Sequence, residues 1–509
     1  MNIKEAKQEI TNTLRAYLAK DELGNYLIPS IRQRPVLLMG PPGIGKTQIM
    51  EQIASETGVG LVSYTITHHT RQSAIGLPFI EKETFDGQEF SITEYTMSEI
   101  LASVYRLMKK TGLKEGILFL DEINCVSETL APMMLQFLQC KTFGNQRLPE
   151  GWLIVAAGNP PEYNKSVRDF DVVTLDRVKR IDVTEDFPVW KEYAYRHGLH
   201  GAVISYVDIK KENFYRIEAT VDGLQFVTAR GWEDLSELLQ AYEKLGLRAD
   251  RNVIGQYLQF PQVAKDFANY LDLYYKYQQT YHVEEILNGT YHNVTVLELR
   301  SAPFDEKLSV MGLLLSRLSE VSRKVRVQDE LTDDLYAALK SFKTDIETMA
   351  PQDSLAELIS LRYQNLERAK DAGQLDKTQR SRSLREIRVL ERYLDELRQR
   401  DLTDAGEAME TSRGLFREEV ERRRTVAEEA TAMFDHSFHF LEETFEQSQE
   451  LVIFVTEITA GYDTSWFVEN FGCDAYFRHN RELLFDDTQR RIRDEIASAR
   501  EKKDTEMEN

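Results

Sequence analysis

Hydrophobic and polar residues alternate along the first third of the chain in a pattern that predicts strands separated by helices. Each apolar run is four to six residues long, and the segment that follows it has helical spacing. Short, continuously apolar strands with intervening helices are typical of a parallel sheet that is covered by helices on both faces. The five predicted strands are Val36–Met39, Leu61–Ile66, Gly116–Leu120, Trp152–Ala157 and Arg180–Val183.

Two other patterns accompany this α/β region. Residues 3–20 carry their apolar side chains on one side of a helix, which predicts an amphipathic helix at the N-terminus. Residues 75–96 instead alternate apolar and polar residues around Asp86 and Gly87, which predicts a β-hairpin inserted into the α/β region.

The rest of the chain is predicted to be helical. Residues 188 to about 290 have mostly helical spacing, and Pro261 marks a break between helices. From residue 301 the helical pattern continues almost throughout. Its most regular part has the 3-4-3 spacing of an antiparallel helical hairpin or a short coiled coil, at Ile387, Leu390, Leu394 and Leu397.

These patterns divide the chain into three predicted domains. Residues 1–187 form an α/β domain with a parallel sheet, residues 188–295 form a helical lid, and residues 296–509 form an all-α region with coiled-coil character. A chain of 509 residues with 42% hydrophobic residues is long enough for several domains with sizeable cores.

Composition narrows the class of protein. The chain has 84 Asp and Glu residues against 63 Lys and Arg residues, and the resulting net charge of −21 repels nucleic acid and anionic lipid at long range. No apolar run approaches the roughly 18 residues of a membrane-spanning helix. Three cysteines without metal-ligand spacing suit a reducing compartment. We therefore expect a cytoplasmic protein.

A complete phosphate-binding loop of the pattern G-x-x-x-x-G-K-[ST] follows the first predicted strand. Its glycines let the backbone turn consecutive N–H groups toward a phosphate chain, and the next helix offers its positive N-terminus to the same anion. Lys46 can reach the outer phosphates, and the Thr47 hydroxyl can bind Mg²⁺. The predicted nucleotide-binding residues are Gly40, Pro41, Pro42, Gly43, Ile44, Gly45, Lys46 and Thr47.

Two carboxylates follow the predicted strand at residues 116–120. Asp121 emerges at the end of this strand, where it can hold Mg²⁺ through the water shell of the ion. Glu122 comes next and is suitably placed to polarise a water molecule for attack on the γ-phosphate. Asn159 follows the next predicted strand in a Gly-Asn-Pro turn and can help to position that water. Such a turn is ordinary by itself, and it gains meaning from the two motifs that precede it.

In this order, the segments GPPGIGKT, LFLDEIN, AAGNP, LDRVKRI and VTARGWEDL resemble the motifs of the MoxR-type branch of the AAA+ ATPases. The resemblance covers about residues 5–290. It implies the AAA+ P-loop fold, ATP and Mg²⁺ as cofactors, Walker A at Gly40–Thr47, Walker B at Asp121 and Glu122, and sensor 1 at Asn159. It also matches residues 75–96 to the helix-2 insert of this branch and Lys141–Pro149 to its presensor hairpin.

The resemblance further implies two functional arginines. The arginine finger would be Arg177 or Arg180, and the sensor 2 arginine would be Arg230. The sequence departs from the family at two places, because Val178 stands where Phe is usual and Ala229 where Pro is usual. A guanidinium from a neighbouring subunit would neutralise the charge that spreads over the γ-phosphate oxygens during phosphoryl transfer. The alternative is a local ion pair of Arg177.

The resemblance implies a ring, usually a hexamer, in which ATP hydrolysis remodels or activates a partner protein, often one with a von Willebrand factor A domain. The C-terminal helices would be the docking element. Two other functions stay open: a nucleic-acid motor or loader on the same core, and a nucleotide-gated scaffold with little turnover. The acidic insert argues against nucleic acid, since it has Glu81, Glu83, Asp86 and Glu89 against Lys82.

Overall fold

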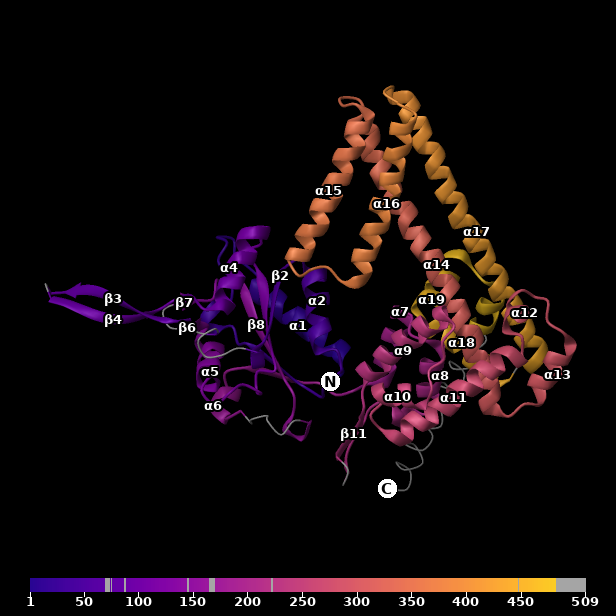
Figure 1. Cartoon of the computed structure of the whole chain (residues 1–509), viewed down its shortest axis with the longest axis horizontal. Coiled ribbons are helices and arrows are strands. Elements are labelled where there is room, and N and C mark those ends of the chain that lie inside the picture. The colour runs from indigo at the N-terminus through magenta and orange to yellow at the C-terminus, as the bar shows by residue number, and fades with distance from the viewer. Residues whose placement is uncertain are drawn as a thin grey trace, which may run out of the picture. The chain divides into compact units, whose positions relative to one another are not determined.

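The computed structural model describes residues 1–68, 74, 76–86, 88–143, 146–163, 170–220, 223–446 and 448–481 (Figure 1). Its contacts form two compact units. The first unit contains Met1–Val189 and Phe342–Ala405, and the second contains Trp190–Ser341 and the described residues from Gly406 on. The chain therefore passes between the units three times. The predicted domain boundaries near residues 187 and 295 stay a prediction.

A five-stranded parallel sheet forms the centre of the first unit, with the strand order β2-β5-β8-β1-β9. Every strand lies within one residue of its predicted bounds, and the predicted α/β fold class is confirmed. The register pairs Met39 with Gly158 and Thr65 with Asp121, so the carboxyl ends of these strands meet at one edge of the sheet. The strands are β1 (Val36–Met39), β2 (Gly60–Thr65), β5 (Gly116–Asp121), β8 (Trp152–Gly158) and β9 (Lys179–Asp182).

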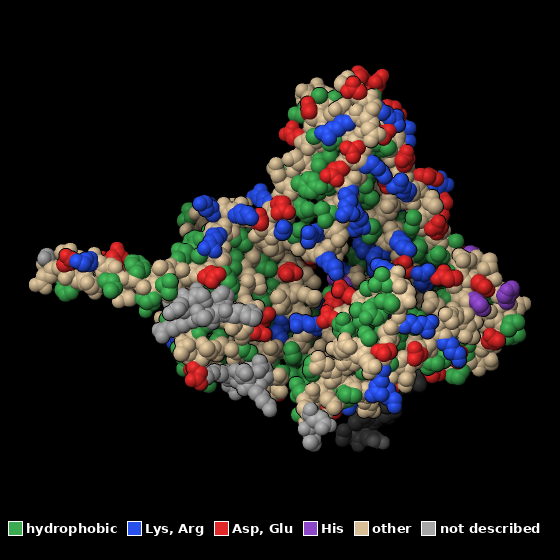
Figure 2. All heavy atoms as spheres, in the orientation of Figure 1, with side chains coloured by type: hydrophobic (Ala, Val, Ile, Leu, Met, Phe, Trp, Pro, Cys, Tyr) green, Lys and Arg blue, Asp and Glu red, His purple; other side chains and the backbone are tan. Residues whose placement is uncertain are grey.

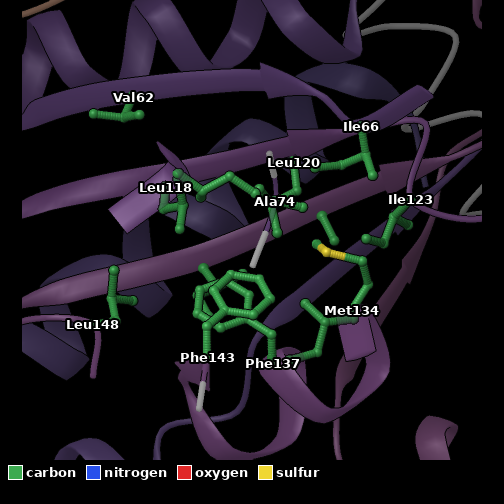
Figure 3. Packing of buried hydrophobic residues seen from close by; sticks show 14 of the residues in the cluster. Val62, Ile66, Ala74, Leu118, Leu120, Ile123, Met134, Phe137, Phe143 and Leu148 are labelled. Carbon is green, nitrogen blue, oxygen red and sulfur yellow. The ribbon is translucent and has the colours of Figure 1, made fainter. Parts of the chain in front are cut away.

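Helices cover both faces of this sheet, because successive residues of a strand point to opposite faces. Val36 and Leu38 pack against the apolar sides of α1 (Ile3–Leu18) and α2 (Lys46–Thr57). The other face packs against α4 (Glu99–Thr111) and α5 (Ala131–Cys140). Figure 3 shows this second cluster, in which Phe137 and Phe143 stack beside a group of fully buried aliphatic side chains that includes Leu118, Leu120, Ile66 and Met134.

The predicted insertion is a β-hairpin of β3 (Pro78–Phe85) and β4 (Gln88–Tyr95), and among the described residues these strands pair only with each other. Residues 75 and 87, which the prediction included, lie outside the described residues. The two strands extend away from the sheet as a narrow ribbon, and hydrophobic side chains lie on its surface (Figures 1 and 2). Phe79, Ile80 and Phe90 are 44%, 76% and 47% exposed.

A second, shorter hairpin of β6 (Thr142–Phe143) and β7 (Gln146–Arg147) lies where the sequence resembles a presensor hairpin, and residues 144 and 145 between the strands lie outside the described part of the chain. Lys141 precedes this hairpin and is only 5% exposed. Burial lowers the pKa of Lys141 to about 8. Its ammonium donates a hydrogen bond of 3.4 Å to Oε1 of Gln33, which is also buried.

The predicted helical hairpin is present as α15 (Pro351–Asp371) and α16 (Lys377–Gln399), and it belongs to the first unit. Its turn contacts the start of β2, the edge strand of the sheet. The main-chain N–H of Leu61 donates to the carbonyl oxygen of Ala372 at 2.9 Å, and Nε2 of Gln374 donates to the carbonyl oxygen of Val59 at 2.9 Å. A distant part of the sequence thus supplies the edge strand with hydrogen-bond partners.

The second unit is mainly helical, as the sequence predicts, but it also contains a hairpin of β10 (Arg216–Thr220) and β11 (Gly223–Val227) that the sequence reading missed. Asp463 on α19 (Tyr462–Phe471) is fully buried and accepts hydrogen bonds from Nε of Arg323 and Nε of Arg326, both at 2.8 Å. The helices are α7 (Phe187–His197), α8 (Gly201–Ile209), α9 (Ala229–Leu245), α10 (Arg251–Tyr257), α11 (Pro261–Thr280), α12 (Val283–Leu287), α13 (Asn293–Ser301), α14 (Phe304–Asp345), α17 (Ala405–Phe445), α18 (Gln449–Ala460) and α19 (Tyr462–Phe471).

Candidate functional site

The predicted phosphate loop connects β1 to α2 at the carboxyl edge of the sheet. Gly43 and Gly45 have φ angles of 76° and 89°, in the left-handed region that favours glycine. Gly45 is also the N-cap of α2. At Gly40 a Cβ atom would lie 2.8 Å from the carbonyl oxygen of Val183, so the close approach of these two segments requires glycine. All three glycines of the motif thus have a structural reason, which is a left-handed backbone at Gly43 and Gly45 and a close approach at Gly40.

Lys46 joins the loop to the end of β8. Its side chain is buried, and Nζ donates hydrogen bonds to the carbonyl oxygens of Gly40 and Pro41 at 2.8 and 2.7 Å. A third hydrogen bond, of 2.8 Å, goes to Oδ1 of Asn159. The ammonium group therefore lies between the phosphate loop and the predicted sensor residue.

Thr47 and Asp121 form the contact between the two predicted Walker motifs. Oγ1 of Thr47 donates to Oδ2 of Asp121 at 3.0 Å, across the end of the sheet. Hydroxyl and carboxylate oxygens are ligands that Mg²⁺ accepts, and this ion usually keeps several waters and takes only one or two carboxylates from the protein. The described residues contain no group of three or more His, Cys, Asp or Glu side chains that could hold a metal ion by themselves.

Glu122 is half-buried and has an unusual backbone conformation, with φ at 56°. Its main-chain N–H donates to Oδ1 of Asp121 at 2.9 Å. Its side-chain Oε2 accepts a hydrogen bond of 2.7 Å from Oγ1 of Thr67. Thr67 was not among the site residues predicted from the sequence. In the sequence, Thr67 is only a polar residue just after β2. Its relation to the site can be recognised only once β2 is known to lie beside β5.

Asn124 is a second residue that the sequence reading missed, although it belongs to the quoted segment LFLDEIN. It is 3% exposed, and its Nδ2 donates to the main-chain oxygen of Asn159 at 2.8 Å. The structure thus brings the ends of β5 and β8 together through a side chain as well as through the sheet.

Arg177 and Arg180 are exposed at another part of the first unit. Arg177 precedes β9 and donates to Oε1 of Gln139 on α5, and Nε of Arg180 contacts both carboxylate oxygens of Asp182 at 2.9 and 3.1 Å. Because β9 runs parallel to β1 and starts beside its first residue, Arg177 lies at the amino edge of the sheet. Four residues of strand, about 13 Å, separate this edge from the phosphate loop.

Arg230 belongs to the second unit, on the first turn of α9, and its side chain is exposed. The Thr228 hydroxyl caps this helix by accepting a hydrogen bond from the N–H of Gly231 at 3.2 Å. The indole of Trp232 is fully buried and donates to the carbonyl oxygens of Asn213 and Phe214. These two anchors fix the backbone on both sides of Arg230.

A phosphate loop between the first strand and the next helix, with a carboxylate at the end of another parallel strand of the same sheet, defines a P-loop nucleotide-binding domain. The family comparison is more specific. Residues 36–174 match the model of the ATPase family associated with various cellular activities (AAA). The chain therefore contains an AAA ATPase domain. The match includes all predicted Walker A and Walker B residues and Asn159, and it ends before the three candidate arginines.

Other comparisons add little. No curated protein matches the sequence. Among solved structures, the chain is similar to a mutant of RuvB from Thermotoga maritima, with 15% sequence identity over 51% of this chain and 69% of that chain, but the TM-score is 0.28. A likeness at this TM-score carries no argument about fold or function. In the part of the chain that the structure describes, no helix combines the length and the apolar character that crossing a membrane requires.

Proposed function

We propose that this protein is a MoxR-type AAA+ ATP hydrolase, which works as a ring of identical subunits and uses ATP hydrolysis to remodel or activate a partner protein. The observation that carries the proposal is the contact of Thr47 with Asp121, at 3.0 Å, together with that of Lys46 with Asn159, at 2.8 Å. These contacts unite three separate sequence motifs at one edge of the sheet.

ATP would bind with its phosphates in the loop from Gly40 to Thr47. The loop N–H groups and the amino end of α2 supply fixed positive charge to an anion. The Lys46 ammonium would exchange the loop carbonyl oxygens for phosphate oxygens, which are stronger, charged acceptors. Thr47 and Asp121 are suited to hold Mg²⁺, which would neutralise charge on the phosphates when bound.

Glu122 is the proposed general base, because its carboxylate follows Asp121 directly and is half-buried. The hydrogen bond from Thr67 to Glu122 would compete with the attacking water for this carboxylate. Glu122 would therefore act only after it releases Thr67. Asn159 would orient the same water through its side chain.

The arginine finger would act on the neighbouring subunit. Arg177 lies at the amino edge of the sheet, whereas the phosphate loop lies at the carboxyl edge. A head-to-tail contact that closes into a ring, as in a hexamer, can bring these two different surfaces together. Arg177 and Arg180 stay the two candidates, and Arg230 would report the nucleotide state from the helical lid.

The output would be a movement between the nucleotide domain and the lid, transmitted to a bound client. A client with a von Willebrand factor A domain, docked on the C-terminal helices, is what the MoxR resemblance suggests. We propose that this activity takes place in the cytoplasm.

The test of the enzymatic activity compares Lys46→Ala with Glu122→Gln. Fluorescent ATP titration measures affinity, and phosphate release measures turnover. Lys46→Ala should abolish binding, whereas Glu122→Gln should keep binding and lower turnover by roughly 10²- to 10⁴-fold, the usual contribution of a general base. Lys109→Ala and Glu128→Gln, two exposed positions of the same unit, serve as matched controls. Equal loss of affinity in both test variants would contradict the assigned roles.

A further inference from the structure

Asn124 joins the loop behind Glu122 to the end of the neighbouring strand. The hydrogen bond from its Nδ2 to the main-chain oxygen of Asn159 is 2.8 Å long. A carbonyl oxygen can only accept, so this contact fixes which end of the Asn124 amide faces Asn159. The residue is almost completely buried, with 3% of its surface exposed. The contact itself is partly buried, because Asn159 is half-buried.

Asn159 is held at two different points. Asn124 binds its main-chain oxygen, and Lys46 binds its side-chain Oδ1 at 2.8 Å. The loop that carries Asn124 is itself attached to the same strand, because the N–H of Ile123 donates to the carbonyl oxygen of Ala157 at 2.9 Å. Movement of the Asn124 amide would therefore change the direction in which the Asn159 side chain points.

The other end of the amide is in a different environment from the end that binds Asn159. Oδ1 of Asn124 is buried and has no hydrogen-bond donor among the described residues. It lies so close to Gly158 that a Cβ atom there would be 2.6 Å away. A buried acceptor without a donor is unfavourable, and an apolar side chain of the same shape would avoid this. The sequence nevertheless has an amide at this position.

We infer that Asn124 is a positioning residue, which holds the backbone of Asn159 so that the Asn159 amide faces Lys46 and the outer phosphate. The inference rests on the proposed ATPase function and deepens it. Asn124 does not touch the nucleotide in this scheme, and it acts through Asn159. Changes at Asn124 should therefore affect turnover much more than nucleotide affinity.

The first test is Asn124→Leu, which keeps the shape of the side chain and removes both polar ends. The substitution removes Oδ1 of Asn124, which has no donor among the described residues, and this should stabilise the fold. It also removes the hydrogen bond to the main-chain oxygen of Asn159, which should destabilise the fold, so the two effects on stability oppose each other. We expect a melting temperature within about 3 °C of the parent chain. Turnover should fall by about 10- to 10²-fold, as expected when a reacting group is misplaced. Affinity for fluorescent ATP should change by less than about threefold, since the phosphate loop is intact.

A double-mutant cycle separates positioning from a general structural role. Asn159→Ala removes the group that Asn124 is inferred to orient. If Asn124 acts through this group, the double variant Asn124→Leu/Asn159→Ala should turn over within about twofold of Asn159→Ala alone. If the two residues act independently, the two losses should multiply, and this result would overturn the inference.

Turnover of the parent chain distinguishes failure of the positioning role from failure of the proposed ATPase function. An inactive parent would overturn both. An active parent with an equally active Asn124→Leu variant would overturn only the positioning role. If Asn124→Leu does not fold, Asn124→Ala is measured in the same cycle, and failure of both to fold would show that Asn124 is a structural residue and overturn the inference.

Discussion

Arg177 offers the most direct test of a shared active site. The parallel register puts Arg177 at the amino edge of the sheet and the phosphate loop at the carboxyl edge, about 13 Å further along the strand direction. Arg177 is also exposed, and its hydrogen bond goes to the neutral side chain of Gln139. The guanidinium also lies near enough to Asp171 to contribute to the lowered pKa of that carboxyl, so it would have to leave local partners to reach a neighbouring subunit. We expect Arg177→Ala to lower turnover by up to ~10³-fold and to leave nucleotide affinity almost unchanged.

Mixing two inactive variants gives a quantitative expectation. In a ring assembled at random from equal amounts of Arg177→Ala and Glu122→Gln chains, an interface is intact when one chain supplies Glu122 and the next supplies Arg177. Each condition holds for half of the chains, so about a quarter of the interfaces should be intact, whatever the size of the ring. The mixture should therefore recover about a quarter of the parent turnover per chain.

The assay is phosphate release from the mixture, compared with each variant alone, while native mass spectrometry verifies that mixed rings have formed. Mixed rings without recovered turnover would refute the role of Arg177 in trans. The same experiment with Arg180→Ala would then test the other candidate. Since Arg180 is bound by Asp182 on its own strand, we expect Arg180→Ala to be the milder variant.

Three further predictions concern single side chains. Thr67→Val removes the hydrogen bond that holds Glu122, so turnover should rise by about fivefold, because one hydrogen bond near solvent contributes about 1 kcal/mol; unchanged steady-state turnover would contradict this restraint. Asp463→Asn leaves the two arginines that contact Asp463 without their buried carboxylate, and urea unfolding should show a loss of about 3–5 kcal/mol, whereas a loss below about 1 kcal/mol would refute the importance of the pair. Burial lowers the pKa of Lys141 in the folded chain from 10.5 to about 8, so its charged form destabilises the fold at pH 7 and this effect fades as the pH rises from about 8 toward 10.5. Lys141→Met should thus stabilise the protein by about 3 kcal/mol or less at pH 7 and by almost nothing near pH 10.5, and an equal gain at both values would contradict the assignment.

The central strands of the sheet were predictable because they are buried on both faces. Burial of this kind leaves runs such as Val36–Met39 and Trp152–Gly158 without polar interruption, and their ends coincide with changes in residue type. The hairpin of β10 and β11 is different, because all but one of its strand residues are exposed or half-buried and β10 includes charged residues. Its pattern was not distinguishable from that of the surrounding helices.

Residues of the candidate site could be predicted when they belong to a local motif at the end of a strand. The loop residues and Asn159 directly follow strands, Asp121 is the last residue of one, and the common edge of a parallel sheet brings them together. Thr67 and Asn124 were missed because their contacts depend on the order of the strands and on the path of a loop. Neither is encoded in a local motif.

The turn between α15 and α16 has a consequence for the synthesis of the chain. Leu61 on the edge strand receives its partner, Ala372, only after more than 300 further residues have been made. At roughly 5–20 residues per second, the ribosome needs about 15–60 s for this stretch, and the chain that enters the second unit is made in between. The first unit therefore cannot be completed in the order of translation. The start of its edge strand stays open, and exposed to pairing with other nascent chains, until the returning hairpin has emerged.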